Sequence, residues 1–333
     1  MRVGIWCDLR NPPEWRRPWA EVYATTLERI EEAERLGLDA VWLSEHHFFE
    51  DGYLNQPLTF AAAIAARTER MRIGTAILLA PLRPALDIAE QGALVDIVSD
   101  GRLELGLGAG YRIPEFQAFG VDIADRFPLL EDRVREVRRI WDEQAIVPPP
   151  AQERPGIWIG ANGKRGARMA GRLGEGLMWL DPEMVAVYRE AHAAAGHDPA
   201  TARVSGSVNA IVSSDPERAW ERIAPHLVYQ WETYARYGAE GAEEAGNAVV
   251  SEAATLRAED MRSDGPEMLM PRFDVVTPEE LVRRMRLWLD GLPVSDVYLW
   301  DSIAGMPDDL VAEHVRLLAE EVAPKVRDLG LPT

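Results

Sequence analysis

The sequence predicts a single (β/α)8 TIM barrel over residues 1–333, with an insertion between the seventh and eighth units. Three observations support this. Short apolar runs alternate with longer stretches of helical periodicity, eight such pairs can be read, and the length suits one barrel. Strict alternation implies parallel strands joined by right-handed crossovers, and eight units suggest closure. An open doubly wound sheet is the alternative architecture.

The expected strands are short and mostly apolar. They cover residues 2–7, 40–44, 72–79, 102–107, 156–160, 176–180, 203–212 and 295–300. The stretch after the first strand places Val22, Thr26 and Ile30 on one helical face, and the last helical stretch does the same with Val311 and Val315. Each strand is therefore followed by a helix with a buried face.

Three of the expected helices have clear start signals. Asp181, Asp215 and Thr277 are each followed by proline, so each pairs a capping side chain with a proline at the first helical position. These signals fix where the helices after the sixth and seventh strands begin, and where the last helix before the eighth strand begins.

Residues 238–275 interrupt the alternation. This stretch is rich in Gly, Ala, Glu and Met, and part of it, around residues 248–261, has helical character. An insertion that follows a strand and its helix can reach either face of a barrel. We expect a lid over the active face or a dimer contact, with a surface excursion as the plain alternative.

Composition limits the partners and the location. The net charge is −19, from 36 basic and 55 acidic residues, which disfavours nucleic acid and anionic membranes. No run of about 18 apolar residues is present, and the first residues resemble a strand rather than a secretory signal. With a single cysteine, Cys7, the sequence fits a cytoplasmic protein.

Two adjacent histidines follow the second expected strand, in the segment Ser44-Glu45-His46-His47. Loops after barrel strands form the active face, and histidines there exchange protons near neutral pH. A packed, hydrogen-bonded core histidine is the alternative interpretation. We expect no metal site, because neighbouring side chains on an extended segment point opposite ways and no further ligand lies at metal-binding spacing.

Two glycine-rich segments follow later strands. Gly106-Leu-Gly-Ala-Gly110 closes the fourth strand, where it allows close approach of a ligand or simply forms a turn. Gly160-Ala-Asn-Gly-Lys-Arg-Gly166 joins the fifth strand to a helix. Free N–H groups at that helix start, beside Lys164 and Arg165, predict an anion site, with an exposed basic helix start as the alternative.

Taken in order, these segments resemble the bacterial luciferase-like superfamily of flavin-dependent oxidoreductases. The resemblance extends from Gly37 to about Leu180 and more weakly from Thr277 to Pro324. It also includes Gly74-Thr-Ala with Pro81 and Pro84, and Glu115-Phe with Phe119-Gly120. The resemblance rests on the order and spacing of these segments rather than on any single motif.

The resemblance implies roles for particular residues. His46 matches the family histidine beside the reactive edge of the flavin, and His47 matches its supporting neighbour. The Ala76–Ile77 bond matches a non-proline cis peptide beneath the isoalloxazine ring. The other residues that match cofactor-contacting positions are Gly108, Ala109, Gly110, Asn162, Gly163 and Gly166. Ala109 replaces the arginine with which bacterial luciferase pairs the phosphate, so we expect Lys164 or Arg165 to supply that charge.

The resemblance also implies a function. We expect a two-component monooxygenase that receives reduced FMN from a separate flavin reductase and uses dioxygen on a small organic substrate. A deazaflavin-dependent hydride-transfer enzyme on the same fold is one alternative, and a non-catalytic flavin-binding protein is another. A homodimer is the expected assembly.

Overall fold

The computed structural model describes residues 1–160, 163–240, 257–262, 265–266, 268–269 and 272–330. Two of the sequence predictions therefore concern residues that lie wholly or largely outside these described ranges. Asn162 lies outside the described residues, and so does most of the expected insertion at 238–275.

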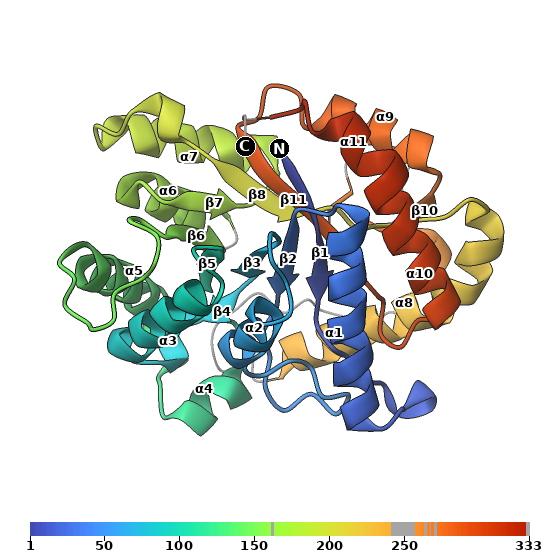
Figure 1. Ribbon diagram of the computed structural model, residues 1–333, viewed down its shortest axis with the longest axis horizontal. Coiled ribbons are helices and arrows are strands. Elements are labelled where there is room, and N and C mark those ends of the chain that lie inside the picture. Colours follow the sequence, from blue (N-terminus) through green and yellow to red (C-terminus); the bar gives the residue numbers. More distant parts are fainter. Residues whose placement is uncertain (161–162, 241–256, 263–264, 267, 270–271, 331–333) are drawn as a thin grey trace.

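Eight parallel strands form a closed barrel, which confirms the predicted fold (Figure 1). Following hydrogen-bonded neighbours, the order is β3-β2-β1-β11-β8-β7-β6-β5, and pairing of β5 with β3 closes the ring. Ile5 in β1, for example, pairs with Val41 on one side and Leu299 on the other. The strands are β1 (Arg2–Cys7), β2 (Ala40–Leu43), β3 (Arg72–Thr75), β5 (Leu103–Gly108), β6 (Gly156–Gly160), β7 (Gly176–Met178), β8 (Val204–Ser207) and β11 (Val294–Trp300).

Helices surround the barrel, and the three predicted start signals are confirmed. The side chains of Asp181, Asp215 and Thr277 accept hydrogen bonds from backbone N–H groups of the first turns of α7, α8 and α9. The helices are α1 (Trp19–Leu36), α2 (Pro57–Ala65), α3 (Ala85–Val98), α4 (Ile113–Phe119), α5 (Arg126–Asp142), α6 (Gly163–Leu173), α7 (Pro182–Ala194), α8 (Pro216–Ala239), α9 (Pro278–Trp288), α10 (Asp308–Leu317) and α11 (Ala323–Val326). None of these helices is both long enough and apolar enough to cross a membrane.

Two expected strands are interrupted. The strand over 72–79 divides into β3 and the short β4 (Leu78–Leu79), on either side of the bond between residues 76 and 77. The strand over 203–212 divides into β8 and β9 (Ala210–Val212). β9 leaves the barrel and pairs in parallel with β10 (Asp274–Val276), a strand that begins at the end of the range assigned to the insertion. A continuous strand over 203–212 is therefore wrong, because a three-residue pairing outside the barrel leaves no periodic signal.

The barrel interior is filled by large side chains that face glycines on neighbouring strands. A Cβ at Gly74 would lie 2.3 Å from the ring of Trp42, and a Cβ at Gly176 would lie 2.2 Å from the ring of Trp158. The two tryptophan rings pack edge to face, and Tyr298 stacks on Trp42. The glycines are thus required by the close packing of the core, since any side chain there would overlap an indole ring.

Ion pairs close the barrel at the amino ends of its strands. Arg2 binds Asp296 at 2.7 Å and Glu104 at 3.0 Å, and Arg72 binds Glu104 at 2.7 Å. Burial would raise the pKa of Glu104, but the two guanidinium groups outweigh it and the pKa is lowered. These ion pairs stabilise the amino end of the barrel. We therefore expect the active site at the opposite end, which is formed by the carboxyl ends of the strands.

Candidate active site

Loops after several strands meet the C-terminal half of α8 at the carboxyl end of the barrel. Arg10, which follows β1, binds Asp51 at 2.6 Å and also donates a hydrogen bond to Thr233 of α8. The hydroxyls of Tyr53, after β2, and Tyr234, on α8, lie 2.9 Å apart. These polar contacts are largely buried. The end of α8 therefore covers the loops that carry the predicted histidines.

His46 is held by a buried carboxylate. Its Nδ1 lies 2.9 Å from Oε1 of Glu115, on α4, and its Nε2 lies 3.3 Å from the hydroxyl of Tyr111. A carboxylate accepts hydrogen bonds, so Nδ1 carries the proton and Nε2 has its lone pair on the Tyr111 side. The same Glu115 oxygen accepts the backbone N–H of His47 at 2.8 Å. Glu115 therefore fixes both the tautomer of His46 and the loop that carries it.

His47 belongs to a second network, built on Glu45. Its Nε2 lies 2.8 Å from Oε1 of Glu45, which also binds Arg83 at 2.6 Å. The other Glu45 oxygen accepts the N–H of Leu79 at 2.7 Å. Burial would raise the pKa of Glu45, but His47, Arg83 and this N–H outweigh burial and lower it. The adjacent histidines thus bind different carboxylates, and Glu45 connects their loop to β4.

Aromatic rings enclose His46. Phe49 stacks on the imidazole with centroids 4.8 Å apart, and Tyr53 meets it edge to face at the same distance. Tyr237 of α8 covers the outer side of Phe49 at 4.1 Å. Burial raises the pKa of Tyr53, so its hydroxyl stays a neutral hydrogen-bond donor. The enclosure excludes water from one side of the imidazole, and Tyr111, which is partly exposed, forms the open side.

The segment predicted to support a flavin lies beside this network. The peptide bond between Ala76 and Ile77 is cis, as the resemblance implies. A Cβ at Gly108 would lie 2.4 Å from Cδ1 of Ile77, and a Cβ at Gly160 would lie 2.3 Å from its Cγ2. The glycines at these strand ends are therefore needed first because they leave room for the Ile77 side chain. This side chain forms what we call the floor of the site. Ile77 also packs against the cluster formed by Leu79, Leu82 and Phe116, the last of which is the neighbour of Glu115, so the floor and the histidine loop are both connected to α4.

The last two residues of the glycine run complete the end of β5. Ala109 is buried, and Gly110 has a positive φ of 71° as the chain turns toward α4. A bulkier residue at 110 would be strained in this conformation. The glycine run forms a turn, and this turn brings Tyr111 and Glu115 to His46. The two interpretations of the run, as a turn and as part of the site, are therefore compatible.

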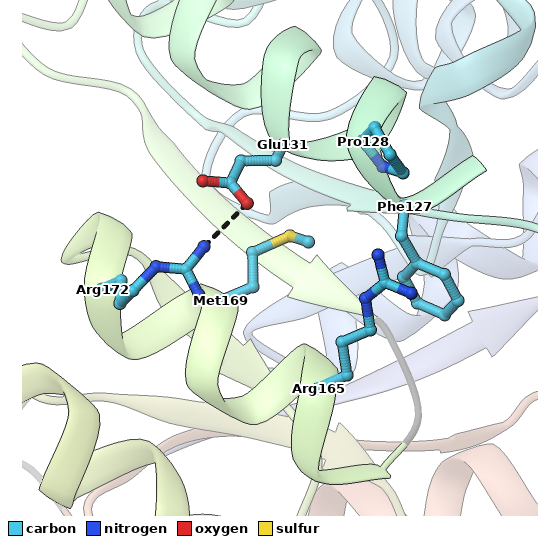
Figure 2. Close-up of a pocket in the computed structure, with 6 residues that line it drawn as sticks. All are labelled: Phe127, Pro128, Glu131, Arg165, Met169 and Arg172. Carbon is cyan, nitrogen blue, oxygen red and sulfur yellow. Dashed lines mark hydrogen bonds and ion pairs between the residues drawn. The ribbon is translucent and has the colours of Figure 1, made fainter. Parts of the chain in front are cut away.

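The start of α6 separates the two predicted cations. Gly163 turns with φ 76°, Gly166 is buried, and Lys164 forms an exposed ion pair with Glu183 of α7 at 2.6 Å. Arg165 has no carboxylate partner among the described residues and lies 4.2 Å over the ring of Phe127 (Figure 2). Arg165 is therefore the cation left available for an anion at this helix start.

These residues fit a phosphorylated flavin. The carboxyl end of the barrel offers a floor at Ile77, an imidazole with an available lone pair at His46, and a cation at Arg165 beside a helix start. In addition, Oε2 of Glu115 is buried without a hydrogen-bond partner among the described residues. A buried acceptor of this kind suits a site completed by a bound molecule.

Sequence reasoning did not identify four of the residues that build this site. They are Glu45, Arg83, Tyr111 and Glu115. Glu115 stands in a quoted motif, but it is separated from His46 by 69 residues, and no spacing rule connects two loops so far apart. From the sequence, Glu115 could be proposed only on the assumption that every buried histidine needs an acidic partner.

Comparisons with known proteins agree with this geometry. Residues 1–293 match the luciferase-like monooxygenase family. A relative from Amycolatopsis mediterranei (strain U-32), F420-dependent glucose-6-phosphate dehydrogenase, is 31% identical over 179 residues, covering 47% of this chain and 54% of its own. The oxygenase component of flavin-dependent trigonelline monooxygenase from Acinetobacter baylyi (strain ATCC 33305 / BD413 / ADP1) is 25% identical over 177 residues, covering 48% and 49%. The chain thus spans about half the length of these curated relatives.

Whole-chain similarity appears among solved structures. The monooxygenase RslO1 from Streptomyces bottropensis superposes with a TM-score of 0.76 at 25% identity, covering 97% of this chain and 99% of that one. The fold is therefore shared over nearly the whole chain.

Proposed function

Because the chain belongs to the luciferase-like monooxygenase family, we propose that it is a flavin-dependent monooxygenase acting with reduced FMN and dioxygen on a small organic substrate. A separate flavin reductase would supply the reduced FMN, an arrangement supported by similarity to a protein named as an oxygenase component. The observation that carries the proposal is the Glu115–His46 pair, buried beside the floor at Ile77.

The residues divide the work of such a reaction. Bound reduced FMN supplies two electrons, so that one oxygen atom enters the substrate and the other leaves as water. His46 takes up or releases a proton at Nε2, and Glu115 stabilises the charged imidazole through Nδ1. Arg165 would hold the phosphate of the bound flavin, and the aromatic enclosure with α8 would keep water away from the reacting groups.

The main alternative keeps the site and changes the cofactor. A deazaflavin would transfer hydride without dioxygen, and the similarity to an F420-dependent dehydrogenase favours this reading. Anaerobic hydride transfer to the deazaflavin, together with no oxygen consumption with FMN, would replace the monooxygenase proposal. A purely flavin-binding protein fits less well, because it gives no reason to bury two carboxylates against two histidines.

A homodimer is the proposed assembly, and α3 is the surface that supports it. This helix exposes Leu86, Leu94 and Val98 on its outer side at four- or eight-residue spacing, with the exposed Glu90 between the two leucines. Leucines exposed by half or more along one stripe are unusual on a free surface. A second copy packed on this stripe would bury them.

The proposed function is tested with variants of the Glu115–His46 pair. Supplied with a flavin reductase and a panel of aldehydes, ketones and phenols, the protein should consume dioxygen and oxidise at least one of them. His46→Ala should lower turnover by roughly 10²–10⁴-fold, the range for a lost proton-transfer group. Glu115→Gln should lower it by less, with Glu115→Asp partly restoring it, while FMN affinity stays within about threefold.

The control is His197→Ala, which removes an imidazole from the outer wall, where it bonds the carbonyl of Arg172. Its turnover should equal that of the wild type. Near-normal turnover of His46→Ala, combined with a lowered melting temperature, would show that His46 is only a packing residue and would remove the central observation.

A further inference from the structure

A small polar cavity lies beside the loop that follows β1, and its lining includes neither site histidine. It has a volume of about 60 Å³ and is bounded by that loop, by α1 and by the loop that follows β11. The lining extends from the exposed Asp308 to the buried Thr26 and Asp8. One water molecule needs about 10–15 Å³, so the cavity has room for several and can connect Asp8 with the solvent.

Asp8 is the acid of this lining that has no ion pair within the described part of the chain. The other charged groups of the lining are paired as Arg10–Asp51 at 2.6 Å, Arg17–Asp308 at 3.0 Å and Arg29–Asp301 at 2.6 Å. Oδ1 of Asp8 accepts the backbone N–H of Arg10 at 3.1 Å. Its Oδ2 is buried and has no hydrogen-bond partner among the described residues. One carboxylate oxygen is therefore left for water in the cavity.

The surroundings of Asp8 let it exchange a proton near neutral pH. Burial raises the pKa of Asp8 from 3.8 to about 7, although Arg10 opposes this, and Asp301 and Asp51 add to the rise. The other titratable groups that interact with Asp8 are Cys7, Tyr53 and Tyr234. Asp8 is therefore present in both protonation states at the pH at which an imidazole titrates.

Polar groups extend from Asp8 to the imidazole of His46. Burial is the main cause of the raised pKa of Tyr53 and of Tyr234, and the charge of Asp8 raises both further. The hydroxyls of these two tyrosines lie 2.9 Å apart. Tyr234 also interacts with Tyr111, whose hydroxyl lies 3.3 Å from Nε2 of His46.

His46 needs such a path during the proposed reaction. Its one open side, at Tyr111, is where the reactants would bind, so during turnover they would keep bulk water away from Nε2. Phe49 and Tyr53 already cover the other sides of the imidazole. A proton that His46 gives up must therefore be replaced from behind these rings.

We propose that Asp8 exchanges protons between the solvent in this cavity and Nε2 of His46, through the hydroxyls of Tyr53, Tyr234 and Tyr111. Each hydroxyl accepts one proton as it passes another on, so no tyrosine becomes charged and one proton moves from solvent to Nε2, or back. Water bridges Asp8 to the tyrosine pair and the pair to Tyr111. This path, the Asp8 relay, rests on the proposed function, because that function assigns the proton transfer to His46.

The first test observes the Asp8 carboxyl itself, without added flavin. Infrared spectra of the isolated protein should contain a carbonyl band of a protonated carboxylic acid that disappears as the pH rises through about 7. Asp8→Asn should lack this band. A spectrum in which no band lost in Asp8→Asn titrates between pH 6 and 8 would overturn the relay, whatever cofactor the protein uses.

The second test measures turnover with a flavin reductase in water and in deuterium oxide. Asp8→Asn should lower turnover by roughly 10²-fold, the lower end of the range for proton-transfer groups, and should enlarge the solvent isotope effect. Tyr234→Phe keeps the ring and should act in the same way. Because both variants interrupt one path, the double variant should be no slower than the slower single one. FMN affinity should stay unchanged in all three.

The control is Asp309→Asn, which removes a carboxylate that binds Arg222 at 2.7 Å on the surface and does not line the cavity. It should keep the turnover, the isotope effect and the infrared band of the wild type. Losses that multiply in the double variant, or normal turnover of Asp8→Asn, would overturn the relay alone. A wild type that consumes no dioxygen with any substrate would overturn the proposed function together with the relay that serves it.

Discussion

Each buried histidine of the described chain behaves according to the partner that its ring meets. His46 and His47 face carboxylates, which can stabilise a positive imidazole. His314 instead bridges two backbone groups: Nδ1 accepts the N–H of Val212 at 2.9 Å, and Nε2 donates to the carbonyl of Trp300 at 3.0 Å. A proton on Nδ1 would break the first bond. One residue type is thus placed for the proposed proton transfer at one position and for a structural role at another.

The role of His314 predicts a pH dependence of stability. Burial lowers its pKa from 6.5 to about 4, while the Trp300 carbonyl opposes this only partly. Between pH 6.5 and 4 the unfolded chain therefore binds a proton that the folded chain does not. Stability is fully present above pH 6.5 and falls as the pH drops, by about 3 kcal/mol at 1.36 kcal/mol per pKa unit.

Urea unfolding at several pH values checks this prediction. His314→Gln keeps one donor and one acceptor but does not titrate in this range, so its stability should fall less steeply between pH 6.5 and 4. Parallel slopes for the two proteins would show that His314 does not cause the acid sensitivity.

At the scale of elements, the end of β5 determines the shape of the site. Gly108 gives room to Ile77, Gly110 turns the chain, and α4 then presents Glu115 to the histidine loop. The same helix contributes Phe116 to the apolar cluster against which Ile77 packs. A small displacement of the end of β5 should therefore move both Ile77 and His46.

Gly108→Ala tests this connection. The added Cβ would lie 2.4 Å from Ile77, so Ile77 has to shift, at a cost of about 1–3 kcal/mol in unfolding free energy. FMN affinity should fall as well, measured by fluorescence titration. Adding Ile77→Ala removes the overlapping side-chain atoms but leaves the Gly160 carbonyl oxygen 2.9 Å from the added Cβ, so it should recover only part of the stability. No recovery at all would mean that the backbone, rather than the Ile77 side chain, limits this position.

At the scale of the whole molecule, charge and the α3 stripe act together. A net charge of −19 keeps copies apart unless a specific apolar surface joins them. The stripe on α3 is such a surface, whereas other exposed apolar side chains, such as Leu287 on α9, stand apart from it. The dimer should therefore depend on α3.

Leu94→Glu should convert a dimer into a monomer at micromolar concentration, because it places a charge in the proposed apolar contact. Leu94 is 57% exposed in the single chain, so folding itself should be little affected. Leu287→Glu, at 60% exposure, is the matched control and should remain dimeric. Light scattering that gives a monomer for the wild type would contradict the assembly.

The sequence by itself determined the barrel, because alternation of strand and helix, capping signals and strand-end glycines are local patterns. It also located His46 and His47, which follow a recognisable strand, whereas the Ala76–Ile77 bond was located through the family resemblance. Only the tertiary structure decided which groups meet: Glu115 with His46, Glu45 with His47, and Lys164 with Glu183. These contacts join loops far apart in the chain, and their geometry depends on how strands close into a ring, which no short window of sequence records.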